Sequence, residues 1–215
     1  MALFDLTVDS YLKVSASDQP APGGGSAAAL AGGLAAALGQ MVVRLTEGRK
    51  AFAELKQDEQ DELTGRIDSL EALRIELTRL IEADTEAYKG FMAAMRLPKG
   101  TDEEKAARRG AMDEAAVTTL EVPLSTCERS LEVLRLLPLI VDKGNPNCIS
   151  DVGTAAQLGR AAVEGAALNV RINLPSIKDK LLAEESLDRV EVACREADQL
   201  VGSMMRRVNE VLSQG

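Results

Sequence analysis

The stretch from residue 20 to residue 45 reads PAPGGGSAAALAGGLAAALGQMVVRL. Its last nineteen residues carry a single charge, Arg44, and their small residues recur at helical spacing. This pattern predicts a central helix that begins after Gly25 and runs to about Glu47, with Gly48 ending it. Small side chains on that helix would let neighbouring backbones approach closely, so we expect it to lie at the centre of the fold.

The Pro-Ala-Pro-Gly-Gly-Gly-Ser turn before this helix has two interpretations. Glycines have no Cβ to keep a ligand away from the backbone, and the first turn of a helix has N–H groups without internal partners. The turn is therefore suited to hold an anion or a carbonyl group. In the plainer interpretation it is a flexible turn with Ser26 near the N-cap. It lacks the spacing and the lysine of a phosphate-binding loop, which argues against phosphate.

Composition excludes several classes of function. The 215 residues suit one domain, residues 1–215, and the net charge of −9 with only two Tyr, three Phe and no Trp argues against nucleic acid as a partner. The chain has no histidine, so the usual proton shuttle and the histidine-containing zinc sites are absent, and no metal site is expected. Acid–base work would fall to Asp, Glu, Lys, Tyr or Cys. The three cysteines form no Cys-x-x-Cys pair and fit free thiols.

The first twelve residues and the uncharged run after Pro20 bear on localisation. No basic region precedes an apolar core at the N-terminus, so we expect no signal peptide and a cytoplasmic protein. The uncharged run consists mostly of Ala and Gly, which gain little from leaving water. We therefore expect a core helix there and no membrane span.

Helical periodicity covers almost the whole chain and predicts an all-α bundle of long helices. Thr101 and Glu104 form a capping-box pattern, and Pro123 and Pro138 are expected to kink or divide the segment that follows. Residues just before Pro175 also alternate as a strand would, which leaves the end of that segment open between helix and strand. The expected segments are 4–14, the central helix, about 51–96, 101 to about 143, 150 or 151 to at most 175, and about 178–212.

A carboxylate lies on the apolar stripe of segment 51–96. Asp84 falls between Ile81 and Tyr88 at the helical spacing that the apolar residues follow. A buried charge costs several kcal/mol unless it is partnered, and a desolvated carboxylate acquires a raised pKa that suits proton transfer near neutrality. Tyr88, one turn later on the same face, is placed to orient Asp84 or to donate to it. The alternative is that Asp84 pairs with a buried arginine or caps a kink.

A second group of polar residues surrounds the turn after residue 143. Asn147 and Asp151 stand at the turn, and Asn169 and Asn173 follow on the inward stripe of the next segment. Amide side chains both donate and accept, so such a stripe could bind the edge of a polar heterocycle. In the alternative, Asn147 and Ser150 are caps, Asp151 is a favourable first-turn charge, and Asn169 makes an interhelical hydrogen bond.

A basic cluster, Arg44, Arg49 and Lys50, marks the end of the central helix. It would either hold the carboxylate tail of a ligand or complement the partial negative charge of the helix C-terminus.

Several motifs in one order go beyond general chemistry and carry a resemblance to a known family. Together they resemble the cyclodeaminase domain of formiminotransferase-cyclodeaminase and its free-standing bacterial relatives, some of which are methenyltetrahydrofolate cyclohydrolases. The resemblance extends from about Phe4 to the last segment. Its motifs are the turn at 20–26, Asp84 with Ala87 and Tyr88, Leu97-Pro98-Lys99, Val122-Pro123-Leu124, Gly144-Asn145 to Gly153, and Asn169 to Asn173.

The resemblance implies an all-helical homodimer that binds folate, with no cofactor beyond the tetrahydrofolate substrate. It implies that Asp84 is the catalytic residue in either the cyclodeaminase or the cyclohydrolase reaction, and it leaves the choice between them and the polyglutamate preference open. A formiminotransferase domain is not expected here, although a separate formiminotransferase could be a partner. A non-catalytic helical protein that dimerises or binds a partner through its Gly/Ala faces is the alternative. The implied pocket residues are Gly23, Gly24, Gly25, Ser26, Asn147, Asp151 and Asn169, to which we add Tyr88.

Overall fold

In the computed structural model, which describes residues 2–214, the predicted all-α bundle of long helices is confirmed, and those residues contain no strand. The stretch before Pro175 is helical, which settles the alternative left open there. The long helices are α2 (Gly24–Thr46), α4 (Gln57–Met95), α5 (Asp102–Lys143), α6 (Ile149–Asn173) and α7 (Lys180–Leu212). The shorter elements are α1 (Val8–Ser15), α3 (Lys50–Ala53) and the 3₁₀ turns Leu3–Asp5, Pro146–Cys148 and Leu174–Ser176.

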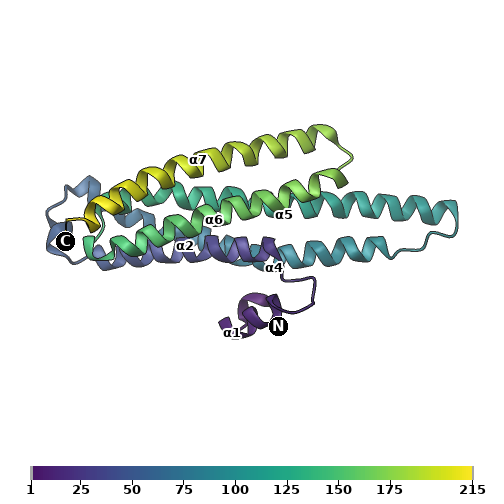
Figure 1. The fold of residues 1–215 in the computed structure, drawn as a ribbon, viewed down its shortest axis with the longest axis horizontal. Helices are drawn as coiled ribbons and strands as arrows, with labels where there is room; N and C mark the ends of the chain where they lie inside the picture. Colours follow the sequence, from purple (N-terminus) through teal and green to yellow (C-terminus); the bar gives the residue numbers. More distant parts are fainter. Residues whose placement is uncertain (1, 215) are drawn as a thin grey trace.

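Helix α2 lies at the centre of the bundle, as its composition predicts. It packs against α4, α5 and α6, while α7 covers α5 and α6 from outside. In Figure 1, α4 and α5 extend together beyond the ends of the other helices, and α1 lies beside the bundle. Close packing depends on glycine: a Cβ at Gly159 would lie 2.7 Å from Leu134 Cδ2, and one at Gly39 would lie 2.9 Å from Leu137 Cδ2. Small residues therefore bring the helix axes together.

Helix α2 was expected to be a core helix and not a membrane span, and its apolarity and burial bear on that expectation. Among residues 2–214, α2 alone is long and apolar enough to cross a membrane by length and composition, with a mean hydropathy of 1.6 over its most apolar window. Of that window, 56% is buried inside the bundle. Such burial is what a central helix requires.

Two of the expected segments are interrupted by local capping. Thr7 Oγ1 accepts a hydrogen bond from the Ser10 N–H, so α1 begins at Val8 and is separate from the 3₁₀ turn before it. The prediction of one helix over residues 51–96 is wrong at its start, because the backbone at Lys56 is extended. The Lys56 N–H donates to Glu59 Oε2 at 3.1 Å and begins a new helix, α4. Caps of this kind stabilise a break in an otherwise helical pattern.

The two prolines do not divide α5, which is continuous from residue 102 to residue 143. Pro123 has no N–H, so the carbonyl of Thr119 four residues earlier loses its usual helical partner. Asn173 supplies a substitute, because its Nδ2 donates to Thr119 O at 2.7 Å. The end of α6 therefore satisfies the defect that the proline creates in α5.

We expect Asn173→Ala to lower the free energy of unfolding by about 1–3 kcal/mol, because it leaves a partly buried carbonyl without a donor. The same substitution in a Pro123→Ala background should cost less, since the restored amide N–H can bond to Thr119. Urea unfolding of the single and double variants measures the coupling between the two positions. Equal costs in both backgrounds would show that the Asn173 hydrogen bond does not compensate for the proline.

Candidate active site

Asp84 is bound to the first turn of α2. Its Oδ2 accepts a hydrogen bond from the Ser26 N–H at 3.0 Å and a longer contact from Ser26 Oγ at 3.3 Å. The N-cap residue, Gly23, has no side chain to cap the helix, so Asp84 on α4 does so from outside. An N-terminal helix turn favours a negative charge at this point. Among the described residues no arginine pairs with Asp84, so the alternative of a buried arginine partner is not what the structure shows.

Opposing effects set the charge of Asp84. Burial raises the pKa of the carboxyl group above its ordinary value of 3.8, and the two hydrogen bonds from Ser26 offset the rise only in part. No Lys or Arg lies among the described residues of the pocket wall. A carboxyl group with a raised pKa can both accept and return a proton, which is the property needed for acid–base catalysis.

Gly25 allows this arrangement because it has no side chain. A Cβ built on Gly25 would lie 2.5 Å from Asp84 Cγ, far inside van der Waals contact. At Gly24 the nearest atom to such a Cβ is Asn169 Nδ2, at 3.2 Å. The glycine run therefore lets α2 approach α4 on one side and α6 on the other, and this close approach explains why the turn contains successive glycines.

Asp84 opens onto a pocket of about 280 Å³ at the junction of the residue 20–24 turn, α4, α5 and α6. Ser26 and Gly25 contact Asp84 directly, although neither lines the cavity. The structure brings several sequence-predicted residues together in the wall: Gly23, Gly24, Asp84, Tyr88, Asn169 and Asn173.

Asn169 is oriented by its own helix. Its Nδ2 donates to Gly165 O at 2.8 Å, one turn earlier on α6, so the hydrogen bond is not the interhelical one that the alternative required. Its side-chain oxygen accepts no hydrogen bond from the described residues and is free to accept one from a ligand N–H.

The structure does not bring Asn147 and Asp151 to this pocket, and that part of the prediction is corrected. The Asn145 N–H donates to Thr46 Oγ1 at 2.8 Å, which places the turn at the last residue of α2. Asp84 lies at the first turn of the same helix, and 23 residues of helix span roughly 35 Å. The Asn147 N–H bonds to Asn145 Oδ1 at 3.1 Å, so Asn147 belongs to a capped turn.

The basic cluster lies at that far end as well. Arg49 Nε donates to Leu45 O at 3.3 Å, and exposed Lys50 pairs with Glu54 at 3.6 Å. Arg44 is also exposed. These contacts match the interpretation in which basic residues complement a helix C-terminus, and they place the cluster away from Asp84.

Reasoning from sequence did not assign three of the wall residues to the pocket: Ala87, Thr119 and Ile172. The carbonyl of Thr119 is the one that loses its helical partner because of Pro123. That proline was therefore the available sequence signal for Thr119. Ile172 is largely exposed although it is large and apolar. Helical periodicity alone does not distinguish such a residue from a core residue.

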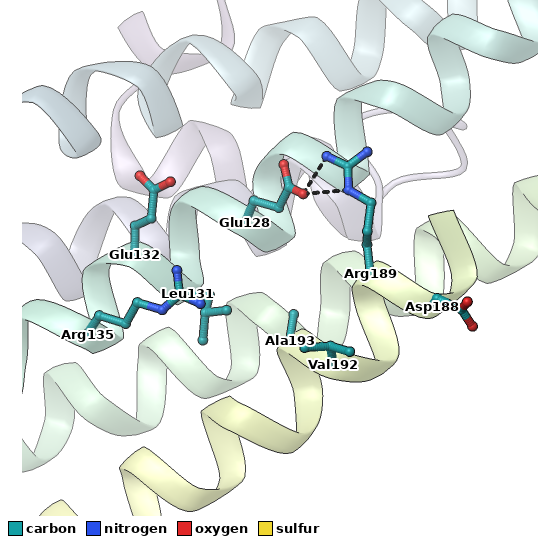
Figure 2. A pocket seen from close by; sticks show the side chains of 8 residues that line it. All are labelled: Glu128, Leu131, Glu132, Arg135, Asp188, Arg189, Val192 and Ala193. Carbon is teal, nitrogen blue, oxygen red and sulfur yellow. Dashed lines mark hydrogen bonds and ion pairs between the residues drawn. The ribbon is translucent and has the colours of Figure 1, made fainter. Parts of the chain in front are cut away.

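A larger cavity of about 490 Å³ lies between α5 and α7 (Figure 2). Both arginines of its wall form ion pairs: Arg189 with Glu128, which also lines the cavity, and Arg135 with Glu196, which does not. In Figure 2 the Asp188 side chain points away from the Arg189–Glu128 pair. Ion pairs at such an exposed surface contribute little to stability, and they leave no unpaired basic group in the described wall for an anionic ligand. We therefore take the Asp84 pocket as the candidate active site.

The fold and the site together define an all-α protein whose pocket is equipped to transfer protons through one carboxyl group. The family model described as Formiminotransferase-cyclodeaminase matches residues 7–192. The chain belongs to the formiminotransferase-cyclodeaminase family, and the resemblance inferred from its motifs is confirmed.

Individual relatives include both free-standing and longer proteins. The chain is 41% identical over 206 residues to a methenyltetrahydrofolate cyclohydrolase from Methylorubrum extorquens, covering 96% of this chain and 95% of that protein. It is 34% identical to the formimidoyltransferase-cyclodeaminase of Rattus norvegicus, covering 91% of this chain but only 36% of that protein. A crystal structure of formiminotetrahydrofolate cyclodeaminase from Thermotoga maritima is similar with a TM-score of 0.79 and 25% identity, over 98% of this chain and 97% of that one.

Proposed function

We propose that the Asp84 pocket is the active site of a tetrahydrofolate one-carbon enzyme that hydrolyses 5,10-methenyltetrahydrofolate to 10-formyltetrahydrofolate. The observation that carries this proposal is a partly buried carboxyl group with a raised pKa, held at a helix N-terminus and facing a cavity. The cyclohydrolase from Methylorubrum extorquens supports the choice of reaction, because the likeness covers nearly the full length of both chains.

In the hydrolysis, water adds to the methenyl carbon held between N5 and N10, and Asp84 accepts a proton from that water. The resulting carboxylic acid returns the proton to N5 as the bond between N5 and the one-carbon unit breaks. The remaining hydroxyl loses its proton to solvent as the formyl carbonyl forms on N10. One carboxyl group therefore serves as base and then as acid.

Cyclodeamination of 5-formiminotetrahydrofolate is the second candidate, supported by the structural likeness to the Thermotoga maritima cyclodeaminase. Here N10 attacks the amidine carbon and loses its proton to Asp84. Asp84 then protonates the departing nitrogen, a further proton comes from solvent, and ammonia leaves as the methenyl bridge closes. Asp84 has the same two duties in both reactions, so its geometry supports either one.

An apolar groove supports binding of the flat parts of the substrate. A cavity of about 700 Å³ runs along α4 and α5, lined largely by Ala and Gly, and it shares Ala87 with the wall of the Asp84 pocket. Small side chains present a smooth surface against which an aromatic ring can pack. We place the pterin and one-carbon centre at Asp84 and the aminobenzoyl ring in this groove.

We also propose that the protein works as a homodimer in the cytoplasm, without a membrane or nucleic acid and with no cofactor beyond its folate substrate. Exposed apolar residues on α2 and α6 support pairing through helices: Leu34, Leu168 and Ile172. A separate formiminotransferase remains a proposed partner if the reaction is the deamination.

A side-by-side assay tests the proposed function. Purified protein is given 5,10-methenyltetrahydrofolate in one reaction and 5-formiminotetrahydrofolate in the other, with loss of the methenyl absorbance and release of ammonia as readouts. We expect turnover of the first substrate above its spontaneous hydrolysis. Ammonia release alone would establish the deaminase instead, and turnover of neither folate would favour a non-catalytic helical protein.

The pH dependence of the same reaction gives a further prediction. We expect kcat/KM to fall as the pH drops through the raised pKa of Asp84, because a protonated carboxyl group cannot accept a proton from water. The acid limb should therefore lie above pH 3.8, the ordinary value for this group. A pH–rate profile corrected for spontaneous hydrolysis measures it. A profile without an acid limb would contradict the role of Asp84 as base.

A further inference from the structure

Both tyrosines of the chain lie near Asp84. Tyr88 is in the pocket wall, and Tyr11 on α1 lies close enough to Asp84 for the negative charge of that residue to act on it. The Tyr11 hydroxyl oxygen is buried and has no hydrogen-bond partner among the described residues. Leaving such a group unpaired costs roughly 1–3 kcal/mol, so an orphaned phenol beside a candidate active site requires an explanation.

The N-terminal segment that carries Tyr11 is attached on both sides of Asp84. Near its start, the Leu3 N–H donates to Glu82 Oε2 at 2.5 Å, two residues before Asp84 on α4. At its end, Pro20 and Ala21 form part of the pocket wall. Tyr11 lies between these two attachments, on the helix that lies beside the bundle in Figure 1.

The electrostatics agree with this placement. Burial raises the pKa of Tyr11, and the negative charge of Asp84 raises it further. Ser15, one turn later, opposes the shift in part, although the two hydroxyls make no hydrogen bond of normal geometry. The phenol therefore lies within the electrostatic field of the Asp84 carboxylate.

Asp84 has an unused acceptor that matches this unused donor. Its Oδ2 receives both contacts from Ser26, whereas its Oδ1 receives no hydrogen bond from the described residues. Helix α1 is loosely held, because none of its residues is fully buried and Val8 and Leu12 are 78% and 62% exposed. Movement of α1 toward α4 would therefore disturb little packing.

We propose that Tyr11 is a positioning residue: when folate fills the pocket, α1 closes toward α4 and the Tyr11 hydroxyl donates a hydrogen bond to Oδ1 of Asp84. This inference rests on the proposed function of the Asp84 pocket. Each carboxylate oxygen can accept two hydrogen bonds, so Oδ1 keeps a lone pair for the transferred proton. The bond would fix the rotation of the carboxylate and favour its charged form.

Tyr11→Phe tests the proposal, because it keeps the ring and removes only the hydroxyl. We expect kcat to fall about 3- to 10-fold with little change in KM. We also expect the acid limb of the kcat–pH profile, which reports the folate complex in which the bond forms, to rise by roughly 0.5–1 pH unit, as loss of one hydrogen bond predicts. The melting temperature should stay the same or rise, since the unpaired hydroxyl is gone. Ser186→Ala is the matched control: it removes another buried, unpartnered hydroxyl from α7, which contributes no described wall residue, and should leave the limb in place.

A second measurement does not depend on turnover. With tyrosines ¹³C-labelled at the ζ carbon, the protein gives two signals, and Tyr11→Phe identifies the one from Tyr11. We expect 5-formyltetrahydrofolate, used as a non-reacting probe, to shift that signal in the parent protein and not in Asp84→Asn. If the parent turns over folate while Tyr11→Phe leaves the limb unmoved, or the Tyr11 signal does not respond to the probe, the inference is overturned and the proposed function stands. Failure of the parent to turn over either folate would count against the proposed function itself.

Discussion

Asp84→Asn is expected to lower kcat for the folate reaction by about 10²–10⁴-fold, the usual contribution of general acid–base catalysis. Asparagine has nearly the same shape and can still accept the Ser26 hydrogen bonds, but it cannot take up or return a proton. Steady-state assays with the folate that the parent protein uses provide the measurement. A variant with an unchanged rate would remove Asp84 from the mechanism.

The stability of the same variant separates loss of chemistry from loss of fold. Because the pKa of Asp84 is raised in the folded protein, its protonated form is the more stabilising one, and this stabilisation is lost as the pH rises through the raised pKa. At neutral pH, Asp84→Asn should therefore melt at the same temperature as the parent or higher. Asp68→Asn, which neutralises an exposed carboxylate on the same helix, is the matched control and should leave kcat unchanged.

Gly25→Ala is expected to have the second largest effect, because it places a methyl group 2.5 Å from Asp84 Cγ. Either Asp84 or the first turn of α2 must move, and overpacking of this kind costs roughly 1–3 kcal/mol of stability. We expect kcat/KM to fall by about 100-fold, since a displacement of about 1 Å can have that effect on a positioned catalytic group. Chemical unfolding and folate kinetics measure the two effects.

Gly33→Ala is the control for this substitution. It lies on the same helix, and the nearest atom to its Cβ would be Leu77 Cβ at 4.0 Å, an ordinary contact. Alanine favours a helix more than glycine does, so Gly33→Ala should stabilise the protein by about 0.5–1 kcal/mol and keep its activity. If both variants lost activity equally, the cause would be the composition of α2 and not the contact with Asp84.

The sequence predicted the fold well because the long helices have strong apolar periodicity. The capping box was also confirmed, since the Glu104 N–H donates to Thr101 Oγ1 and the Thr101 N–H to Glu104 Oε2. What periodicity missed were local hydrogen bonds, such as the one at Lys56 that separates α3 from α4. The proline at 123 did not interrupt α5 because Asn173, 50 residues later, supplies the missing donor.

Site residues were predictable from sequence where the pattern on a single helix face identifies them. They were not predictable where packing between helices determines which residues meet. A carboxylate on an apolar stripe located Asp84, and the glycine run located the turn that contacts it. Asn147 and Asp151 were grouped with Asn169 because all are polar and near in sequence, yet a long helix separates its two ends by tens of ångströms. Tyr11 could not be found from sequence, because the apolar pattern of α1 does not specify which part of the bundle the helix lies against.

The order in which the pocket assembles follows from chain connectivity. Helices α4 and α5 are consecutive and can pair through contacts that are local in sequence, whereas the pocket joins residues 20–24 to residues 169 and 173. Contacts between residues so far apart in the sequence form late, because closing a long loop costs entropy before any contact offsets it. A partly folded chain could therefore be highly helical and still lack an active site, so catalytic activity is a stricter measure of native structure here than helical content.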